Sequence, residues 1–250
     1  MFPLAGQSEL PVVLLIDDDL VSREVTATLL TMSGYTVHTA VSGAASLNML
    51  ASACCRPDVI LMDAQMPGLS GRELIAALRS RNEARIFIVS GSQPPQELLE
   101  AADGFLAKPF SADTLHRLLD GHKTHSDPSL LDPADPVVST EVLAQFRKLM
   151  PEPAVRQIYT AVVADLSKRI EALASAIAKG DADEIHRIGH AIKGGCGMAG
   201  ALQAAHLGAL LEAAPAGAED NQLDNSATLL RDLRTAAQGL ERMLDSELPA

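Results

Sequence analysis

The spacing of hydrophobic and polar positions divides the chain into two parts, and in the first part short apolar runs alternate with helical patterns. The apolar runs are PVVLLI (11–16), YTVHTA (35–40), PDVILM (57–62), ARIFIVS (84–90) and GFLA (104–107). The helical patterns are Leu20–Met32, Ala44–Ala53, Arg72–Arg79, Gln96–Ala101 and Ala112–Leu119. Continuous apolar strands that alternate with helices predict a parallel sheet covered on both faces. We therefore expect an α/β, flavodoxin-like, doubly wound domain with strand order 2-1-3-4-5.

The second part shows only helical spacing. Its long helical patterns are Val155–Lys179, Ala182–Ala199, Ala201–Ala213 and Leu223–Leu244, with Thr140–Leu149 as a short additional helix. Gly180-Asp181 and the segment PAGAEDN interrupt the pattern. Long helices joined by short turns predict an all-α, antiparallel four-helix bundle.

A proline-rich segment separates the two parts. In HKTHSDPSLLDPADP (122–136), each of Pro128, Pro133 and Pro136 follows an aspartate. A residue before proline is driven out of the helical region, so three such pairs predict a stiff, extended connector. We place a first domain at 1–122, a linker at 123–136 and a second domain at 137–250.

Composition and charge exclude several classes of function. The net charge is −12 and tryptophan is absent, which disfavours nucleic acid as a partner. Three cysteines cannot form a disulfide framework and fit a reducing compartment. The N-terminal residues do not form a signal-peptide pattern, and no apolar run is long enough to span a membrane. We therefore expect a cytoplasmic protein with no membrane contact.

Polar residues gather at the ends of the predicted strands. Asp17 and Asp18 follow the first strand, Asp63 the third, Ser90 the fourth and Lys108 the fifth. In an open parallel sheet, these strand ends form the ligand-binding edge. Carboxylates crowded together favour a hard cation, and oxygen ligands with water suit Mg²⁺. With a hydroxyl and an ammonium beside them, such a site can hold a phosphoryl group on an aspartate.

An alternative enzyme class shares part of this pattern. LLIDDDLV also matches the start of haloacid-dehalogenase-like phosphatases, with Asp17 as the nucleophile. That class requires Gly-Thr after the second aspartate, where this chain has Leu20-Val21. It also leaves Asp63 unexplained, so we prefer the phosphoaspartate interpretation.

A second cluster lies in HRIGHAIKGGCGMAG (186–200). On a helix, His186, His190, Lys193, Gly194 and Gly197 form one stripe, opposite an isoleucine face. We expect the stripe to face solvent, with His190 central and the glycines giving access for a docking partner. Two alternatives remain open from the residues alone. The glycines could permit close helix packing, and His186 with His190 could bind a metal.

The first part resembles a bacterial response-regulator receiver domain over residues 10 to 122. The resemblance rests on VLLIDDD, VILMDAQMPGLSG, IVSGS and FLAKPF in this order. It implies that Asp63 accepts the phosphoryl group, that Lys108 and Ser90 contact it, and that Phe105 is the switch aromatic. It also implies an Mg²⁺ site formed by Asp18, Asp63 and the main-chain carbonyl of Gln65, with Asp17 acting through a metal-bound water. A cis Lys108-Pro109 bond is expected from the same resemblance.

The second part resembles a histidine-phosphotransfer domain. HRIGHAIKGGCGMAGA is similar to the H-x-x-K-G-x-[SA] signature, which implies that His190 carries a phosphoryl group and that Lys193 assists it. Gly195 stands where that family frequently has serine, and Cys196 where it has a small polar residue.

Together these resemblances imply a phosphorelay intermediate. The chain shows no nucleotide-binding kinase pattern, so a sensor histidine kinase would phosphorylate Asp63 in trans, and His190 would pass the group to a separate response regulator. Magnesium-dependent self-phosphorylation and dephosphorylation at Asp63 are the only catalytic activities expected. The alternative is a binding switch, in which Asp63 phosphorylation regulates docking and His190 carries nothing.

Both sites need access for outside partners. We therefore expect Asp63 and His190 to be exposed and well separated in a resting structure. Direct transfer would then need a domain rearrangement or a second molecule.

Overall fold

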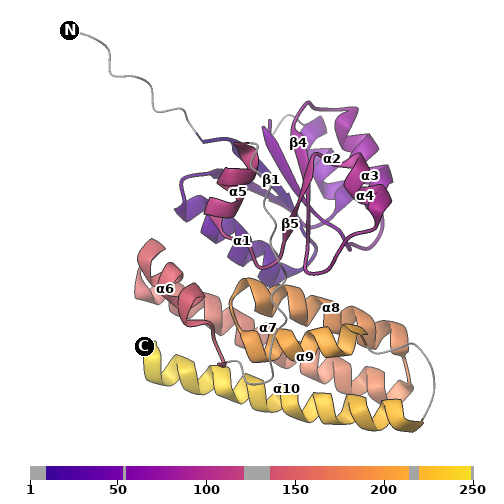
Figure 1. The fold of residues 1–250 in the computed structure, drawn as a ribbon, viewed down its shortest axis with the longest axis vertical. Coiled ribbons are helices and arrows are strands. Elements are labelled where there is room, and N and C mark those ends of the chain that lie inside the picture. Colours follow the sequence, from indigo (N-terminus) through magenta and orange to yellow (C-terminus); the bar gives the residue numbers. More distant parts are fainter. Residues whose placement is uncertain (1–9, 53–54, 121–135, 214–219, 249–250) are drawn as a thin grey trace.

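The computed structural model describes residues 10–52, 55–120, 136–213 and 220–248, which fold into an α/β domain and a helical domain (Figure 1). The predicted linker 123–136 lies, except for Pro136, outside the described residues, as do the first nine residues. The parallel strands are β1 (Val12–Ile16), β2 (Thr36–Ala40), β3 (Val59–Asp63), β4 (Arg85–Ser90) and β5 (Gly104–Ala107). Their order, β2-β1-β3-β4-β5, confirms the predicted doubly wound sheet.

Helices cover both faces of the sheet, which explains why its strands are apolar at successive positions. Helices α1 (Leu20–Met32) and α5 (Ala112–Leu119) lie on one face; α2 (Gly43–Ala51), α3 (Gly71–Arg79) and α4 (Gln96–Ala101) lie on the other (Figure 1). Side chains alternate accordingly along β1. Val13 and Leu15 are buried toward α1, whereas Leu14 and Ile16 are buried toward α3. Because all five strands are parallel, the polar residues that follow them lie at one edge of the sheet.

The helical domain contains the predicted bundle and the short additional helix. Its elements are α6 (Thr140–Leu149), α7 (Glu152–Lys179), α8 (Ala182–Met198), α9 (Leu202–Ala213) and α10 (Asp220–Glu247). In the bundle, α8 contacts both α7 and α9, and α10 contacts both α7 and α9. Helix α7 ends at Gly180, whose φ of 67° is left-handed and explains why glycine stands at this break. Across the described ranges, no helix combines the length and apolarity that a membrane span requires.

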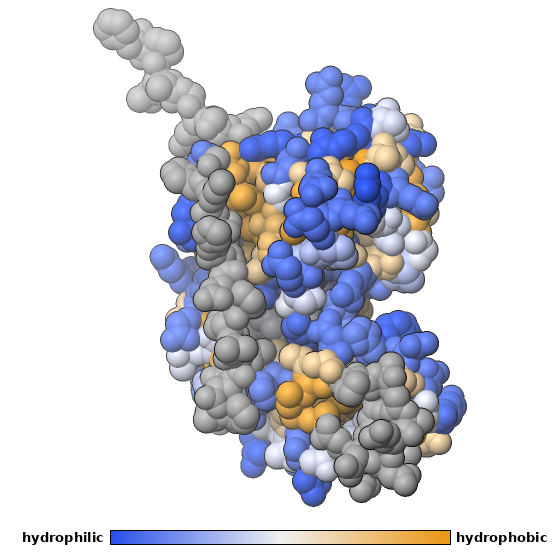
Figure 2. All heavy atoms as spheres, turned by 45° about the vertical axis from the view of Figure 1, so that its right-hand side comes forward, coloured by the Kyte–Doolittle hydropathy of each residue, from blue (hydrophilic) through white to orange (hydrophobic). Residues whose placement is uncertain are grey.

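The two domains pack directly against each other. Helix α1 of the α/β domain contacts α6, α7 and α8, and α8 lies along the side of the bundle nearest the sheet (Figure 1). The buried cluster on the α1 face continues into the bundle, because Val21 and Val25 belong to the same cluster as Ile192 and Cys196. Hydrophilic side chains surround the visible part of this junction (Figure 2).

Candidate functional site

The strand ends bring three predicted site residues into contact. Lys108, immediately after β5, donates from Nζ to Asp17 Oδ2 and to Asp63 Oδ1, each at 2.8 Å. All three side chains are buried, with Asp63 only 4% exposed. The Lys108-Pro109 peptide bond is cis, as predicted.

The charges of this cluster are strongly coupled. Burial alone would lower the pKa of Lys108, but the adjacent Asp63 and Asp17 carboxylates raise it well above its usual range, so the ammonium stays charged. The pKa of Asp18 is also raised, but for a carboxyl group this favours the neutral form. Partial burial, followed by repulsion from Asp17 and Asp63, raises the pKa of its carboxyl. The site therefore holds more negative charge than Lys108 alone can offset.

This donor set suits a hard cation. Asp17, Asp18 and Asp63 supply carboxylate oxygens, and the Gln65 amide donates to Asp63 Oδ2 at 3.1 Å, which places the loop after β3 over the site. Among the described residues, no three acidic, histidine or cysteine side chains close around a point as a metal cage. Mg²⁺ needs no such cage, because it keeps several waters and takes one or two carboxylates. The residues present fit that ion.

Asp17 accepts hydrogen bonds on both carboxylate oxygens, which bears on the phosphatase alternative in which it is the nucleophile. Oδ1 accepts from the Asp19 amide at 2.9 Å, and Oδ2 accepts from Ser22 Oγ at 2.7 Å as well as from Lys108. The Arg23 guanidinium donates to the Asp17 carbonyl at 2.7 Å and fixes the same turn. Asp17 thus accepts three hydrogen bonds, one of them from Lys108, which suits it to positioning the Lys108 ammonium beside Asp63.

Ser90 lies at the end of β4, beside this cluster. It is 1% exposed, and its Oγ accepts from the Ser92 amide at 3.2 Å. The next residue, Gly91, lies against the bundle, because a Cβ there would be 3.4 Å from Lys193 Cε. The loop after β4 therefore touches both the carboxylate site and the histidine-bearing helix.

His190 on α8 is held by a residue that the sequence did not reveal. Its Nδ1 lies 2.8 Å from Oε1 of Glu212 on α9, and Lys193 Nζ donates to Oε2 of the same carboxylate at 2.9 Å. An ionised carboxylate only accepts hydrogen bonds, so the proton of the neutral imidazole sits on Nδ1. The Nε2 lone pair is then free to act as a nucleophile.

Glu212 remains ionised in this position. Burial would raise its pKa, but the hydrogen bonds from His190 and Lys193 lower it to about 2. The Nδ1 atom of His186 lies 2.8 Å from the Glu212 main-chain carbonyl oxygen, so the two histidines contact different atoms of the same residue. This arrangement gives no support to the His186–His190 metal pair. The only signal for Glu212 in the sequence was an acid near the end of a predicted helix.

The lowered pKa of Glu212 predicts a pH dependence of stability. A carboxyl group whose pKa is lower in the folded than in the unfolded protein stabilises the fold. For Glu212 this stabilisation is complete above the unfolded-state pKa, near 4.5, and is lost as the pH falls toward the folded-state pKa of about 2. We expect the difference in unfolding free energy between wild type and Glu212→Gln to be constant above about pH 5. It should shrink steadily below pH 4.5. Urea unfolding across the pH series measures it, and a difference that grows as the pH falls below 4.5 would contradict the ion-pair assignment.

The structure corrects the expectation that the stripe glycines Gly194 and Gly197 both give access, because Gly197 is buried, and it gives two other glycines a packing role. A Cβ at Gly189 would lie 2.7 Å from the Glu212 amide nitrogen, and one at Gly208 of α9 would lie 2.6 Å from the Lys193 nitrogen. These two glycines let α8 and α9 approach closely, which is the packing alternative. Only Gly194 faces open space, since no atom lies within 4 Å of its Cβ position.

This difference predicts opposite effects of one substitution. Gly189→Ala should destabilise the bundle by about 1–3 kcal/mol, because overpacking forces α9 away. Gly194→Ala should stabilise it by about 0.5–1 kcal/mol through helix propensity. Thermal or urea unfolding of the two variants measures both. Equal effects at the two positions would contradict the close α8–α9 crossing.

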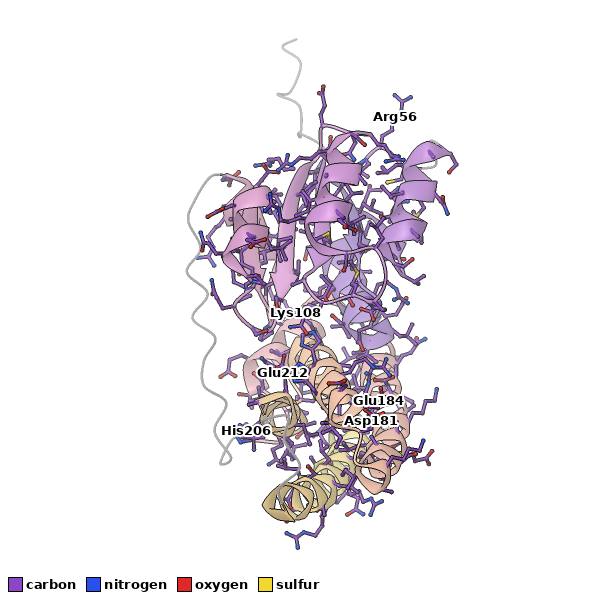
Figure 3. All side chains as sticks on the ribbon, turned by 90° about the vertical axis from the view of Figure 1, so that its right-hand side faces the viewer. Arg56, Lys108, Asp181, Glu184, His206 and Glu212 are labelled. Carbon is purple, nitrogen blue, oxygen red and sulfur yellow. The ribbon has the colours of Figure 1, made fainter. Side chains whose placement is uncertain are left out.

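One cavity joins the carboxylate cluster to the histidine. It has a volume of about 640 Å³ and is lined from the sheet by Asp17, Asp18, Asp63 and Lys108, and from the bundle by His190 and Gly194. Figure 3 shows Lys108 at the edge of the sheet nearest the bundle, and Glu212 within the bundle. His190 has only 17% of its side chain exposed. The expectation that both sites stand open is therefore wrong, because Asp63 and His190 are both largely buried and line one cavity between the domains.

Comparisons with known proteins match the two domains separately. Residues 13–120 match the model of the response regulator receiver domain, and residues 157–245 match that of the Hpt domain. The sensor histidine kinase AruS of Pseudomonas aeruginosa is 31% identical to this chain. The alignment covers 78% of this chain and 20% of AruS. The response regulator MprA of Mycobacterium ulcerans is 34% identical, and that alignment covers 58% of this chain and 62% of MprA.

Two solved structures each align with a little under half of this chain. The chemotaxis protein CheY4 of Vibrio cholerae is 30% identical, covering 46% of this chain and 99% of its own, with a TM-score of 0.40. The response regulator TrrA of Thermotoga maritima, solved in complex with Mg²⁺-BeF, is 28% identical, covering 45% and 98%, also with a TM-score of 0.40.

Proposed function

Because the chain joins a response regulator receiver domain to an Hpt domain, we propose that it is a phosphorelay intermediate that accepts a phosphoryl group on Asp63 and carries it on His190. The Asp63 carboxylate is the acceptor because it ends the central strand and lines the cavity. Lys108 offsets the charge of the bound group, and Ser90, at the end of the neighbouring strand β4, supplies a hydroxyl.

Receiver domains generally bind Mg²⁺, and this site has the ligands for it. In our proposal Asp17, Asp18, Asp63 and the main-chain carbonyl of Gln65 hold the ion, directly or through water. The ion supplies positive charge that offsets the phosphoryl oxygens. Lys108 supplies the fixed part of that charge from the protein itself.

His190 is the carrier in the helical domain. Glu212 keeps the proton on Nδ1 and orients the ring, while Lys193 holds Glu212 and adds positive charge next to the imidazole. A phosphoryl group enters and leaves through Nε2. Relatives that include a sensor histidine kinase and a response regulator support the same classes as upstream donor and downstream acceptor.

The cavity shared by Asp63 and His190 carries this proposal. Its test is to phosphorylate the chain with ³²P from a cognate kinase or acetyl phosphate and to follow the chemical stability of the label. We expect base-labile phosphoaspartate first, and then acid-labile, base-stable phosphohistidine on His190. Label that never becomes base-stable, together with a change in partner binding on phosphorylation, would favour the binding switch instead.

A further inference from the structure

An ion pair joins the two domains beside the shared cavity. Asp19, the N-cap of α1, pairs with Arg169 of α7, and Arg169 Nε also donates to Asp165 at 2.5 Å. Only 13% of the Asp19 side chain and 20% of the Arg169 side chain are exposed. A largely desolvated charge pair of this kind fixes the register in which two surfaces meet.

A close backbone approach adds to this contact. A Cβ at Gly195 of α8 would lie 3.1 Å from Asp19 Oδ1 and 3.4 Å from Val21 Cβ. Any larger side chain at Gly195 would therefore push α1 away from α8. Between His190 and Gly195 along α8, the Lys193 stem packs on Gly91. The receiver domain thus contacts α8 at positions three and five residues beyond His190.

These contacts set which surfaces face each other. The start of α1 directly follows Asp17 and Asp18, so fixing α1 on α8 also fixes the carboxylate edge above His190. Domains joined in one chain meet at an effective concentration in the millimolar range when the geometry allows docking. Here the docked geometry is the one that the chain adopts.

Building on the function proposed above, we propose that the phosphoryl group passes from Asp63 to His190 within a single chain, and that Arg169 is the positioning residue for this transfer. The His190 Nε2 lone pair forms the new N–P bond as the P–O bond to Asp63 breaks. Asp63 regains its carboxylate. The Nδ1 proton stays on the ring, where Glu212 offsets the positive charge that develops, so no other reactant is required.

The first test separates transfer within a chain from transfer between chains. In wild-type protein labelled on Asp63, the label should reach His190 at a rate that does not change with protein concentration. Labelled His190→Gln mixed with Asp63→Asn at about 1 µM each should transfer at least a hundredfold more slowly, because the millimolar effective concentration is lost. Equal rates in the mixture, or a rate proportional to concentration, would overturn the inference.

The second test concerns Arg169. Arg169→Ala should slow the transfer about tenfold or more, and Arg169→Lys should recover much of the rate because the charge is retained. Lys179→Ala, the same loss of charge at an exposed position of α7, is the matched control and should transfer normally. Gly195→Leu leaves Arg169 in place but puts a large side chain against Asp19 and Val21 of α1, so it should hinder the same docking and also slow transfer. Faster transfer in Arg169→Ala would overturn the inference, since the contact would then hold the domains in an unproductive state.

Failure of this inference is distinct from failure of the proposed function. If Asp63 labels normally and His190 is labelled only between molecules, the relay stands and transfer within the chain is excluded. If neither the intact chain nor the mixture ever labels His190, both proposals fall.

Discussion

Asp63→Asn should abolish Mg²⁺-dependent phosphorylation of the receiver domain by acetyl phosphate. The amide has nearly the same shape and can still accept from Lys108, which lies 2.8 Å from Asp63 Oδ1 in the wild type. The fold should therefore be retained while the nucleophilic carboxylate is lost. Intact-mass spectrometry after timed incubation gives the extent of labelling, and circular dichroism checks the fold.

Two variants make this result specific. Asp113→Asn replaces an exposed carboxylate on α5 and should label like wild type. Asp18→Ala removes a proposed metal ligand, so labelling should weaken and be partly restored by excess Mg²⁺. Labelling of the Asp63→Asn variant at the wild-type rate within residues 13–120 would mean that another residue is the acceptor.

His190→Gln should abolish formation of base-stable phosphate, and Glu212→Gln should reduce its rate on the order of 10²-fold. The reason for the second effect is the tautomer. A glutamine amide can donate to Nδ1, which would move the ring proton to Nε2 and block the nucleophilic atom. Lys193 would also lose the carboxylate to which it donates at 2.9 Å.

The measurement is the rate at which label moves from Asp63 to His190 in a single turnover. Glu171→Gln, an exposed acid on α7, is the matched control and should leave the rate unchanged. Labelling of Asp63 should be normal in all three variants. A wild-type transfer rate in Glu212→Gln would show that Glu212 does not set the tautomer.

The local pattern of the chain was sufficient for the elements and their order. Strands that are buried on both faces form continuous apolar runs, which can be recognised without tertiary information. The observed sheet order matches the prediction. Errors were confined to boundaries. Helix α7 begins at Glu152 rather than Val155, because proline is well tolerated in the first turn and Pro153 belongs to the helix.

The strand-end residues were predictable for the same reason. Parallel strands align their carboxyl ends, so Asp17, Asp63 and Lys108 had to meet at one edge once the sheet order was known. The position of His190 on a helix also follows from spacing alone. The position of a residue at a strand end or on a helix can be predicted from the periodic pattern of that single element.

Contacts between elements depend on packing, and spacing along one element does not encode them. Glu212 is 22 residues from His190 in the chain and reaches it only because Gly189 and Gly208 let two helices cross closely. The Asp19–Arg169 pair joins residues 150 positions apart. Arg169 meets Asp19 because apolar residues of α1 are buried in the same cluster as those of the bundle. The sequence alone thus determined which polar residues end the parallel strands and which histidine lies on a helix. Tertiary packing decided that these two clusters line one cavity. The reason is that apolar surface buried between two domains leaves no periodic signal within either domain.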